Sequence, residues 1–263
     1  MNSDLSPSLD GMVIMVSGGT QGVGAAIARA AARAGAGIMI TGRRPELGAA
    51  AVAQLRDLGA EAAFVTADVA DVDQARGSVR TTIERFGRID GLVNAAGLTT
   101  RGTLLDTTPE LFDQHVAVNL RGPFFMMQAA VADMVRRNAS GSIVNVLTMS
   151  AHGGQPYLTP YVATKAALTA LTRNAAHAYR WDRVRINGVN IGWTLTEGED
   201  QIQRRFHDAS DGWAERAGAT LPMGRLALPE DAEALVVLLL SPASGVVTGS
   251  IIDWDQNVVG AYD

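Results

Sequence analysis

Short apolar runs alternate with longer amphipathic stretches along almost the whole chain. The apolar runs predict buried strands, and the stretches between them, whose apolar residues recur at helical spacing, predict helices. Strict alternation of the two implies an α/β fold, in which a doubly wound parallel sheet carries helices on both faces. The predicted strands are 12–17, 37–41, 62–67, 91–95, 142–148, 183–191 and 250–254, and the predicted helices are 22–35, 45–59, 71–87, 108–138, 159–180 and 229–241.

No repeat or linker-like segment interrupts this pattern, and 263 residues suit one large α/β domain. We therefore predict a single domain over residues 1–263. The segment 198–228 is polar and is predicted to be irregular. We expect residues from about 193 to 228 to form a mobile lid over a substrate, with a solvated start in the acidic stretch 197–200.

Composition narrows the classes of function. Apolar residues make up 47% of the chain and charged residues 19%, which provides a sizeable core and argues against disorder. A net charge of −5 disfavours nucleic-acid binding. The absence of cysteine excludes disulfides and thiolate nucleophiles, and the histidines show no metal-ligand spacing, so no metal is expected.

No part of the sequence suggests a membrane segment or a secretion signal. The apolar run 234–240 is far too short to span a bilayer. The polar stretch 1–10 lacks the apolar centre of a signal peptide. These features predict a soluble, cytoplasmic protein.

A glycine-rich turn follows the first predicted strand. Residues 17–24 read SGGTQGVG, so that Gly18, Gly22 and Gly24 open the first helix. Glycines let the backbone approach a pyrophosphate, and the N-terminus of a helix favours its negative charge. The spacing differs from the general G-x-G-x-x-G dinucleotide motif, and an ordinary tight turn would also select glycine.

The end of the second predicted strand distinguishes between two dinucleotides. An acidic residue at this position would bind the 2′-hydroxyl of NAD(H), and an arginine would accommodate the 2′-phosphate of NADP(H). The sequence here is TGRR (41–44), with Gly42 at the acidic position and Arg43 after it. This pattern favours NADP(H), with NAD(H) possible. Alternatively, Arg43 and Arg44 are solvated loop residues.

Tyr161 and Lys165 lie four residues apart in YVATK (161–165), on one face of a predicted helix. A free tyrosine is a poor base because its pKa is near 10. An ammonium one turn away favours the phenolate and is expected to lower that pKa. Such a tyrosine exchanges a proton with an alcohol or a carbonyl. The same pair is also common on an ordinary helix surface.

Four features occur in order: SGGTQGVG, NAAG (94–97), Asn119 and YVATK. As a set they resemble the short-chain dehydrogenase/reductase family, in its short single-domain branch, over residues 9–255. The resemblance implies a Rossmann-type fold and an NAD(P)-dependent oxidoreductase. Such an enzyme transfers hydride between nicotinamide and a secondary alcohol or ketone. It also implies a homotetramer or homodimer, assembled through the helices predicted at 108–138 and 159–180.

The resemblance assigns roles by position. Tyr161 would be the general acid/base, Lys165 would bind the nicotinamide ribose and lower the tyrosine pKa, and Asn119 would hold a water that links Lys165 to solvent. Alternatively, Asn119 bonds back to its own helix backbone. The implied cofactor-binding residues are Ser17, Gly18, Thr20, Gln21, Gly22, Val23, Gly24, Arg43, Asp68, Val69, Asn94, Ala95, Gly97, Tyr161, Lys165, Thr194 and Thr196.

The catalytic serine of the family has no direct counterpart. It stands thirteen residues before the tyrosine, where this chain has Thr148. Threonine keeps the hydroxyl but adds a methyl group and a stiffer χ1. Ser150, two residues further on, is the alternative donor. Thr148 is favoured by position, and the remaining interpretation is that it only suits the end of a strand.

Loops at the carboxyl ends of the predicted strands are expected to contact the substrate. They are rich in hydrogen-bond donors and include Thr99, Thr100 and Arg101, which favours a polar substrate such as a sugar, polyol or hydroxy acid. The alternative function is a non-catalytic NAD(P)-binding regulator of the same fold, since fold does not fix function. The candidate substrate residues are Ser150, His152, Gln155, Tyr157 and Trp193.

Overall fold

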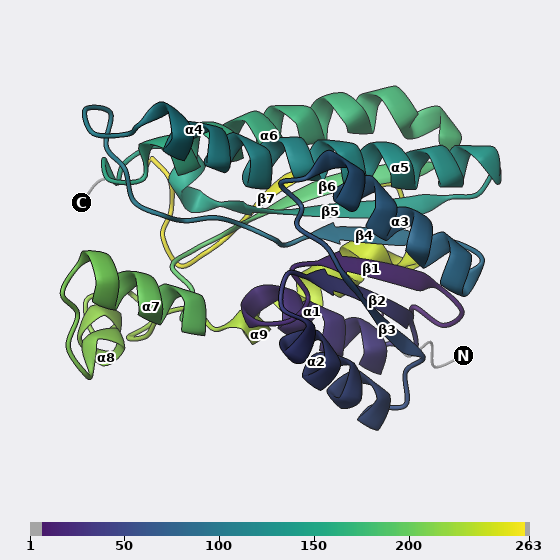
Figure 1. Ribbon diagram of the computed structural model, residues 1–263, viewed down its shortest axis with the longest axis horizontal. Coiled ribbons are helices and arrows are strands. Elements are labelled where there is room, and N and C mark those ends of the chain that lie inside the picture. The colour runs from purple at the N-terminus through teal and green to yellow at the C-terminus, as the bar shows by residue number, and fades with distance from the viewer. Residues whose placement is uncertain (1–6, 261–263) are drawn as a thin grey trace.

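The computed structural model describes residues 7–260 and contains a seven-stranded parallel sheet with helices on both faces (Figure 1). The strand order is β3-β2-β1-β4-β5-β6-β7. The predicted fold class is confirmed. Residues 1–6, on which part of the signal-peptide argument rests, lie outside the described residues. No helix within residues 7–260 is both long and apolar enough to cross a membrane.

The elements follow the predicted alternation. The strands are β1 (Val13–Ser17), β2 (Gly37–Gly42), β3 (Ala62–Thr66), β4 (Gly91–Asn94), β5 (Gly141–Thr148), β6 (Val184–Ile191) and β7 (Ile251–Trp254). The α-helices are α1 (Gly22–Arg33), α2 (Pro45–Asp57), α3 (Val72–Phe86), α4 (Pro109–Val116), α5 (Gly122–Arg136), α6 (Thr159–Tyr179), α7 (Glu197–Phe206), α8 (Trp213–Gly218) and α9 (Pro229–Leu240). Shorter helical turns are η1 (Ala117–Arg121), η2 (Met149–His152), η3 (Arg180–Asp182) and η4 (Pro242–Ser244).

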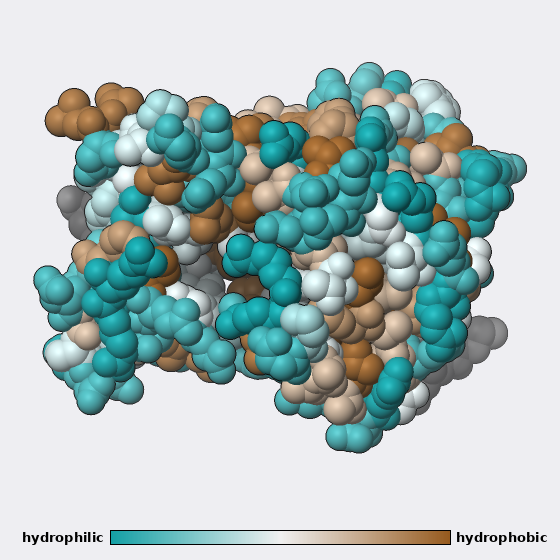
Figure 2. All heavy atoms as spheres, viewed as in Figure 1, coloured by the Kyte–Doolittle hydropathy of each residue, from teal (hydrophilic) through white to brown (hydrophobic). Residues whose placement is uncertain are grey.

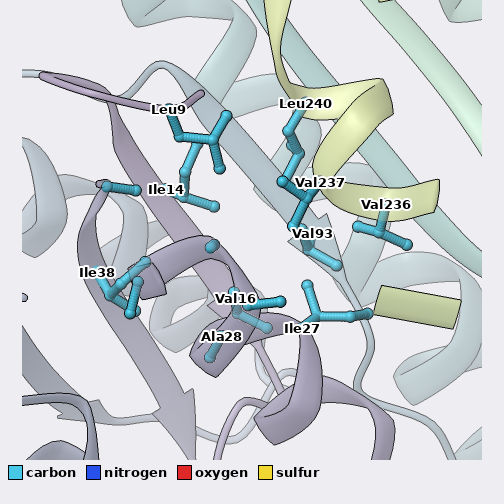
Figure 3. Packing of buried hydrophobic residues seen from close by; sticks show 14 of the residues in the cluster. Leu9, Ile14, Val16, Ile27, Ala28, Ile38, Val93, Val236, Val237 and Leu240 are labelled. Carbon is cyan, nitrogen blue, oxygen red and sulfur yellow. The ribbon is translucent and has the colours of Figure 1, made fainter. Parts of the chain in front are cut away.

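The core has two layers because the central strands are buried on both faces. In β1, Ile14 and Val16 join the cluster under α1 and α9, whereas Met15 joins the cluster under α3 and α5. Figure 3 shows the first cluster, in which Ile27 of α1 and Val237 of α9 pack on the same face of the sheet. Figure 1 shows α1, α2 and α9 on one face and α3, α5 and α6 on the other. The continuous apolar strands thus account for both helix layers.

The strand order creates a crevice at one edge of the sheet. The chain leaves β1 toward β2 and β3, and then returns to place β4 on the other side of β1. Ser17, at the end of β1, is paired with Thr41 on one side and Asn94 on the other. Ligands of open α/β sheets bind where the strand order reverses, outside the carboxyl ends of the strands. The fold therefore fixes where a dinucleotide would lie.

The helix predicted at 108–138 is found as a continuous helical run over residues 109–136, but it is not one uniform α-helix. It is divided into α4 and α5 by the π-helical segment η1 (Ala117–Arg121). Pro123 has no N–H, so it cannot donate to the Asn119 carbonyl as an α-helix would require. Instead, the Gly122 N–H donates to the Ala117 carbonyl, five residues back. Such π-helical turns are common at functional sites.

The predicted irregular structure of 198–228 is also wrong, because α7 and α8 lie within it. Thr196 caps α7 by accepting a hydrogen bond from the Glu199 N–H at 3.0 Å. Acidic residues fill the first turn of α7, and Arg204 and Arg205 lie in its last turn, which suits the helix dipole. The helix therefore depends on capping and charge, signals that apolar periodicity does not detect.

The segment 193–228 leaves the sheet and returns to the same point. The Leu195 N–H donates to the Ala227 carbonyl at 2.8 Å, and the Ala227 N–H donates to the Trp193 carbonyl at 3.0 Å. In Figure 1, α7 and α8 stand to the left of the sheet and its helices. Because its two ends are hydrogen-bonded to each other, this segment forms a distinct unit attached at the carboxyl ends of the strands.

Buried charged side chains stabilise the other end of the sheet, where β1 and β4 begin. Asp133 on α5 is 4% exposed and pairs with Arg137 Nε at 2.7 Å. Arg137 also donates to the Ile89 carbonyl and approaches Asp90, whose carboxylate accepts the N–H of Val13. Burial raises the pKa of Asp133, but hydrogen bonds from Arg137 and Arg136 outweigh it and hold the pKa below its usual range.

We predict that Asp133→Ala lowers the free energy of unfolding by about 3 kcal/mol, because it removes the closest carboxylate from the largely buried Arg137 guanidinium. The folded pKa of Asp133 lies below the unfolded one, so this contribution is present at neutral pH and is lost as pH falls through the folded pKa. Urea unfolding at pH 7 measures the loss. The control is Glu61→Ala, which removes an exposed pair with Arg85 and should cost less than about 1 kcal/mol. Equal losses would contradict the assignment.

Candidate active site

A cleft of about 970 Å³ lies at the carboxyl ends of the strands. Figure 2 shows the surface hollowed between the α7–α8 segment and the rest of the molecule. Three of the predicted site residues, Ser17, Asn94 and Asn119, are buried behind this surface and are absent from its described lining. The cleft brings together Gly18, Thr20, Gln21, Gly22, Val23, Gly24, Arg43, Asp68, Val69, Ala95, Gly97, Thr148, Ser150, His152, Gln155, Tyr157, Tyr161, Lys165, Trp193, Thr194 and Thr196.

The glycine turn requires glycine for steric reasons. A Cβ on Gly18, whose φ is +74°, would lie 2.7 Å from the Ala96 backbone, and one on Gly24 would lie 2.2 Å from the Gly18 carbonyl oxygen. Gln21, the N-cap of α1, makes no side-chain cap, and the first turn of α1 contains no acidic residue. The N–H groups that open the helix therefore face the cleft without a side-chain acceptor, which fits a pyrophosphate.

The corner at the end of β2 is closely packed around Gly42. A Cβ on Gly42 would lie 2.9 Å from Thr20 Cγ2. Arg43 and Arg44 follow, both exposed and both lining the cleft, and Arg44 donates to the Gln21 side chain. Positive charge without a carboxylate at position 42 fits a phosphorylated ribose.

Asn94 contributes to the sheet rather than to the cleft surface. Its Nδ2 donates to Asn145 Oδ1 at 2.8 Å, and Asn145 Nδ2 donates to Thr172 Oγ1 at 2.8 Å. This chain of buried amides connects β4, β5 and α6.

Asp68 and Val69, which follow β3, line the cleft, and the Asp68 carboxylate accepts the Ala70 N–H at 3.0 Å.

Tyr161 and Lys165 lie one turn apart on α6, and both line the cleft. The Lys165 side chain is buried, its Nζ lies 5.9 Å from the centre of the Tyr161 ring, and it donates to the Val146 carbonyl at 2.7 Å. Burial lowers the pKa of Lys165 to about 8. An ammonium has three N–H donors, and within residues 7–260 only Val146 accepts from this one. Its remaining capacity fits ribose hydroxyls.

The predicted lowering of the Tyr161 pKa by Lys165 is not found in this structure. Burial raises the pKa of Tyr161 to about 12, because a buried phenolate loses its hydration. A hydrogen bond with Thr148 opposes this rise, Glu199 adds to it, and Arg101 reduces it. Tyr161 therefore holds its proton at neutral pH, as a general acid must.

Thr148 and Ser150 are in different positions relative to Tyr161. Thr148 ends β5, is 7% exposed and lies close enough to Tyr161 to lower the pKa of the tyrosine. Its Oγ1 also accepts the Ser150 N–H at 3.2 Å. The Ser150 hydroxyl instead donates to Gln155 Oε1 at 2.8 Å. The geometry favours Thr148 as the hydroxyl beside the tyrosine.

The Asn119 side chain has no hydrogen bond to the backbone of its own helix within residues 7–260, although its Nδ2 lies 3.2 Å from His115 Nδ1, one turn earlier. Its Oδ1 accepts the Leu98 N–H at 2.8 Å and its Nδ2 donates to the Leu98 carbonyl at 2.9 Å, so it holds the chain after β4. Its Nδ2 also approaches Thr164 of α6 at 3.3 Å. A Cβ on Gly97 would lie 3.7 Å from Asn119 Oδ1 and 4.0 Å from Lys165 Nζ, so these groups surround one small space.

Sequence reasoning missed Glu199. The stretch 197–200 was expected to be solvated, but the Glu199 side chain is only 15% exposed and lines the cleft. Trp193 Nε1 donates to Glu199 at 2.8 Å. His152, expected only to line the pocket, also pairs with Asp253 of β7 at 2.9 Å. No local pattern marks Glu199, because Arg101, which helps to enclose its carboxylate, lies 98 residues away in the chain.

Comparisons with known proteins agree with this geometry. The short-chain dehydrogenase family model described as enoyl-(acyl carrier protein) reductase matches residues 3–256. L-rhamnose 1-dehydrogenase (NAD(P)(+)) of Sphingomonas sp. (strain SKA58) is 36% identical over 250 residues, covering 93% of this chain and 94% of that protein.

Solved structures give the same result. A short-chain type dehydrogenase/reductase from Mycobacterium marinum has a TM-score of 0.88 at 28% identity, covering 97% of this chain and 98% of that one. A candidate NAD(P)-dependent gluconate 5-dehydrogenase from Beutenbergia cavernae, with NADP at low occupancy, has a TM-score of 0.86 at 29% identity, covering 95% and 97%.

These matches cover nearly the whole chain, and the relatives are named as dehydrogenases, which supports catalysis over the regulatory alternative. The chain thus belongs to the short-chain dehydrogenase/reductase family and is an NAD(P)-dependent oxidoreductase.

Proposed function

We propose that the protein is an NADP(H)-preferring dehydrogenase of a polar secondary alcohol, such as a sugar, polyol or hydroxy acid. The observation that carries this proposal is the placement of Thr148, Tyr161 and Lys165 on the same cleft as the glycine turn. Donor-rich side chains around the same cleft, among them Gln155 and Trp193, favour a polar substrate.

Tyr161 exchanges the proton of the substrate oxygen, and Thr148 orients that oxygen by hydrogen bonding. A bound nicotinamide dinucleotide supplies or accepts the hydride, and its oxidised form adds a positive charge. In the reductive direction Tyr161 donates its proton to the carbonyl oxygen as negative charge develops there. Thr148 donates its one hydroxyl hydrogen to the same oxygen and stabilises the charge that develops there.

Lys165 binds the nicotinamide ribose with the donors that Val146 leaves free. Asn119 holds the chain after β4 beside Lys165, and Pro123 withholds the N–H that would occupy its carbonyl in an α-helix. That carbonyl is thereby available to a water that passes protons between Lys165 and solvent. Asn119 is in this account a positioning residue.

NADP(H) preference rests on Arg43 and Gly42. Arg43 lines the cleft directly after β2, which suits contact with the 2′-phosphate of the adenosine ribose, and Gly42 has no carboxylate to repel it. Gly18, Gly22 and Gly24 hold the pyrophosphate, Asp68 and Val69 flank the adenine, and Thr194 and Thr196 contact the nicotinamide amide and phosphates.

The segment 193–228 acts as a lid, since its two ends meet at the Trp193–Ala227 hydrogen bond and α7 lines the cleft. Assembly into a homotetramer or homodimer through α5 and α6 is part of the proposal. Exposed apolar side chains on α5, Phe124 and Val135, support it. Location in the cytoplasm stays a prediction from sequence.

Tyr161→Phe should lower kcat by roughly 1,000-fold, because no other group is placed to exchange the proton. Stopped-flow absorbance measures turnover, and fluorescence titration measures NADPH binding, which should change less than about threefold. Retention of more than a tenth of the wild-type kcat would refute the role of Tyr161.

Substitution of each hydroxyl residue in turn distinguishes the catalytic role of Thr148 from that of Ser150. Thr148→Ala should lower kcat roughly 100-fold, as loss of one oxyanion donor does. Thr148→Ser should restore most of the activity, and Ser150→Ala should change kcat less than about fivefold, because its hydroxyl bonds Gln155. The reverse order in steady-state kinetics would assign catalysis to Ser150.

Arg43→Ala should raise the KM for NADPH about tenfold and leave that for NADH unchanged, since a charge-assisted hydrogen bond of ~1.5 kcal/mol is lost only with the phosphorylated ribose. The control is Arg80→Ala on α3, an exposed arginine outside the described cleft lining. If both nucleotides weaken equally, Arg43 does not bind the 2′-phosphate.

A further inference from the structure

A charged pair lies in the substrate part of the cleft. Arg101 comes from the loop after β4 and Glu199 from the first turn of α7, and both line the cleft. Their side chains are 10% and 15% exposed, and Arg101 Nη2 lies 3.5 Å from Glu199 Oε1. The pair therefore connects the body of the protein to the segment 193–228.

The carboxylate is fixed by groups of its own segment. Trp193 Nε1 and Gln203 Nε2 both donate to Glu199 Oε1 at 2.8 Å. Within residues 7–260 every hydrogen bond to this carboxylate falls on Oε1, and none falls on Oε2. One carboxylate oxygen is thus left to accept from a ligand.

The guanidinium is also held in place. Arg101 Nη1 donates to the Thr99 carbonyl and Nε donates to His207 Nε2, each at 3.0 Å. The guanidinium lies 5.2 Å from the centre of the Tyr157 ring. Its contact with Glu199 is long, so that donors of Nη1 and Nη2 remain for a ligand.

Both charges lie within electrostatic reach of the reacting centre. Glu199 raises the pKa of Tyr161 and Arg101 lowers it. A substrate whose reacting oxygen lies at Tyr161 would place its remote groups near both charges. The names of the relatives leave the charge of such a substrate open, because they include both rhamnose, a neutral sugar, and gluconate, a carboxylate.

We propose that Arg101 and Glu199 together recognise neighbouring hydroxyls of an uncharged sugar or polyol, and that they discriminate against the corresponding acid. This inference rests on the proposed dehydrogenase function. A hydroxyl group can donate to Glu199 Oε2 while its neighbour accepts from Arg101, which suits a diol.

A substrate with a carboxylate group would meet negative charge in this part of the cleft. A carboxylate bound to Arg101 would lie beside the largely buried Glu199 carboxylate, whose like charge would repel it. Asp255 also lines the cleft and adds a second negative charge, whereas Arg205 lines it from an exposed position. Repulsion of the wrong ligand is a common source of specificity.

Sorbitol and gluconate test this inference, because they share one carbon skeleton and differ at a terminal group. Wild-type protein should show a kcat/KM at least tenfold higher for sorbitol than for gluconate, each with NADP. Glu199→Gln keeps the shape and removes the charge, so it should reduce this ratio at least tenfold. Arg101→Met should raise the KM for sorbitol at least tenfold.

The matched control is Glu197→Gln, an exposed carboxylate on the same turn of α7, which should leave the ratio unchanged. The pH profile of kcat/KM adds a readout that a purely structural role would not move. Glu199→Gln should shift the limb due to Tyr161 to lower pH, because Glu199 raises that pKa, and Glu197→Gln should not. Thermal unfolding verifies that each variant is folded.

Two failures are distinguishable with 2-butanol as a third substrate. If 2-butanol is turned over and the kcat/KM for gluconate equals or exceeds that for sorbitol, the inference is overturned and the dehydrogenase function stands. The same conclusion follows if Glu199→Gln leaves the sorbitol-to-gluconate ratio unchanged. Absence of turnover with all three substrates, while NADP binds, would overturn both.

Discussion

The buried ammonium of Lys165 organises the functional end of the protein. Its only hydrogen bond within the described residues goes to the Val146 carbonyl, which ties α6 to β5. A buried charge with so few partners is costly, and burial lowers its pKa to about 8. Packing of α6 against the sheet holds the group there, and ribose hydroxyls would satisfy its remaining donors. The same contact keeps Tyr161, one turn earlier, beside Thr148.

The two halves of the cleft are built by different means. The nucleotide half depends on backbone geometry, because Gly18 and Gly24 bring chain segments closer than any side chain would allow. The half that we propose for the substrate is lined in part by side chains of the segment 193–228, whose two ends are hydrogen-bonded to each other. A fixed nucleotide site beside an attached recognition segment lets one fold serve different substrates.

Sequence reasoning predicted what local patterns encode. Alternating apolar runs predicted all seven strands, and the spacing of YVATK placed Tyr161 and Lys165 on one helix face. It failed for features that depend on contacts between residues far apart in the sequence. Glu199 meets Arg101, 98 residues away in the chain, only in the fold. The raised pKa of Tyr161 likewise follows from burial by several elements, which spacing along one helix cannot reveal.

Hydride transfer by the wild-type protein tests the central claim most directly. Purified protein would be given sugars, polyols, hydroxy acids and the matching ketones, each with NADP(H) or NAD(H), while the nicotinamide absorbance is followed. The account predicts turnover of a polar secondary alcohol or ketone, with a higher kcat/KM for NADP(H) than for NAD(H). Tight nucleotide binding without turnover of any substrate would contradict it.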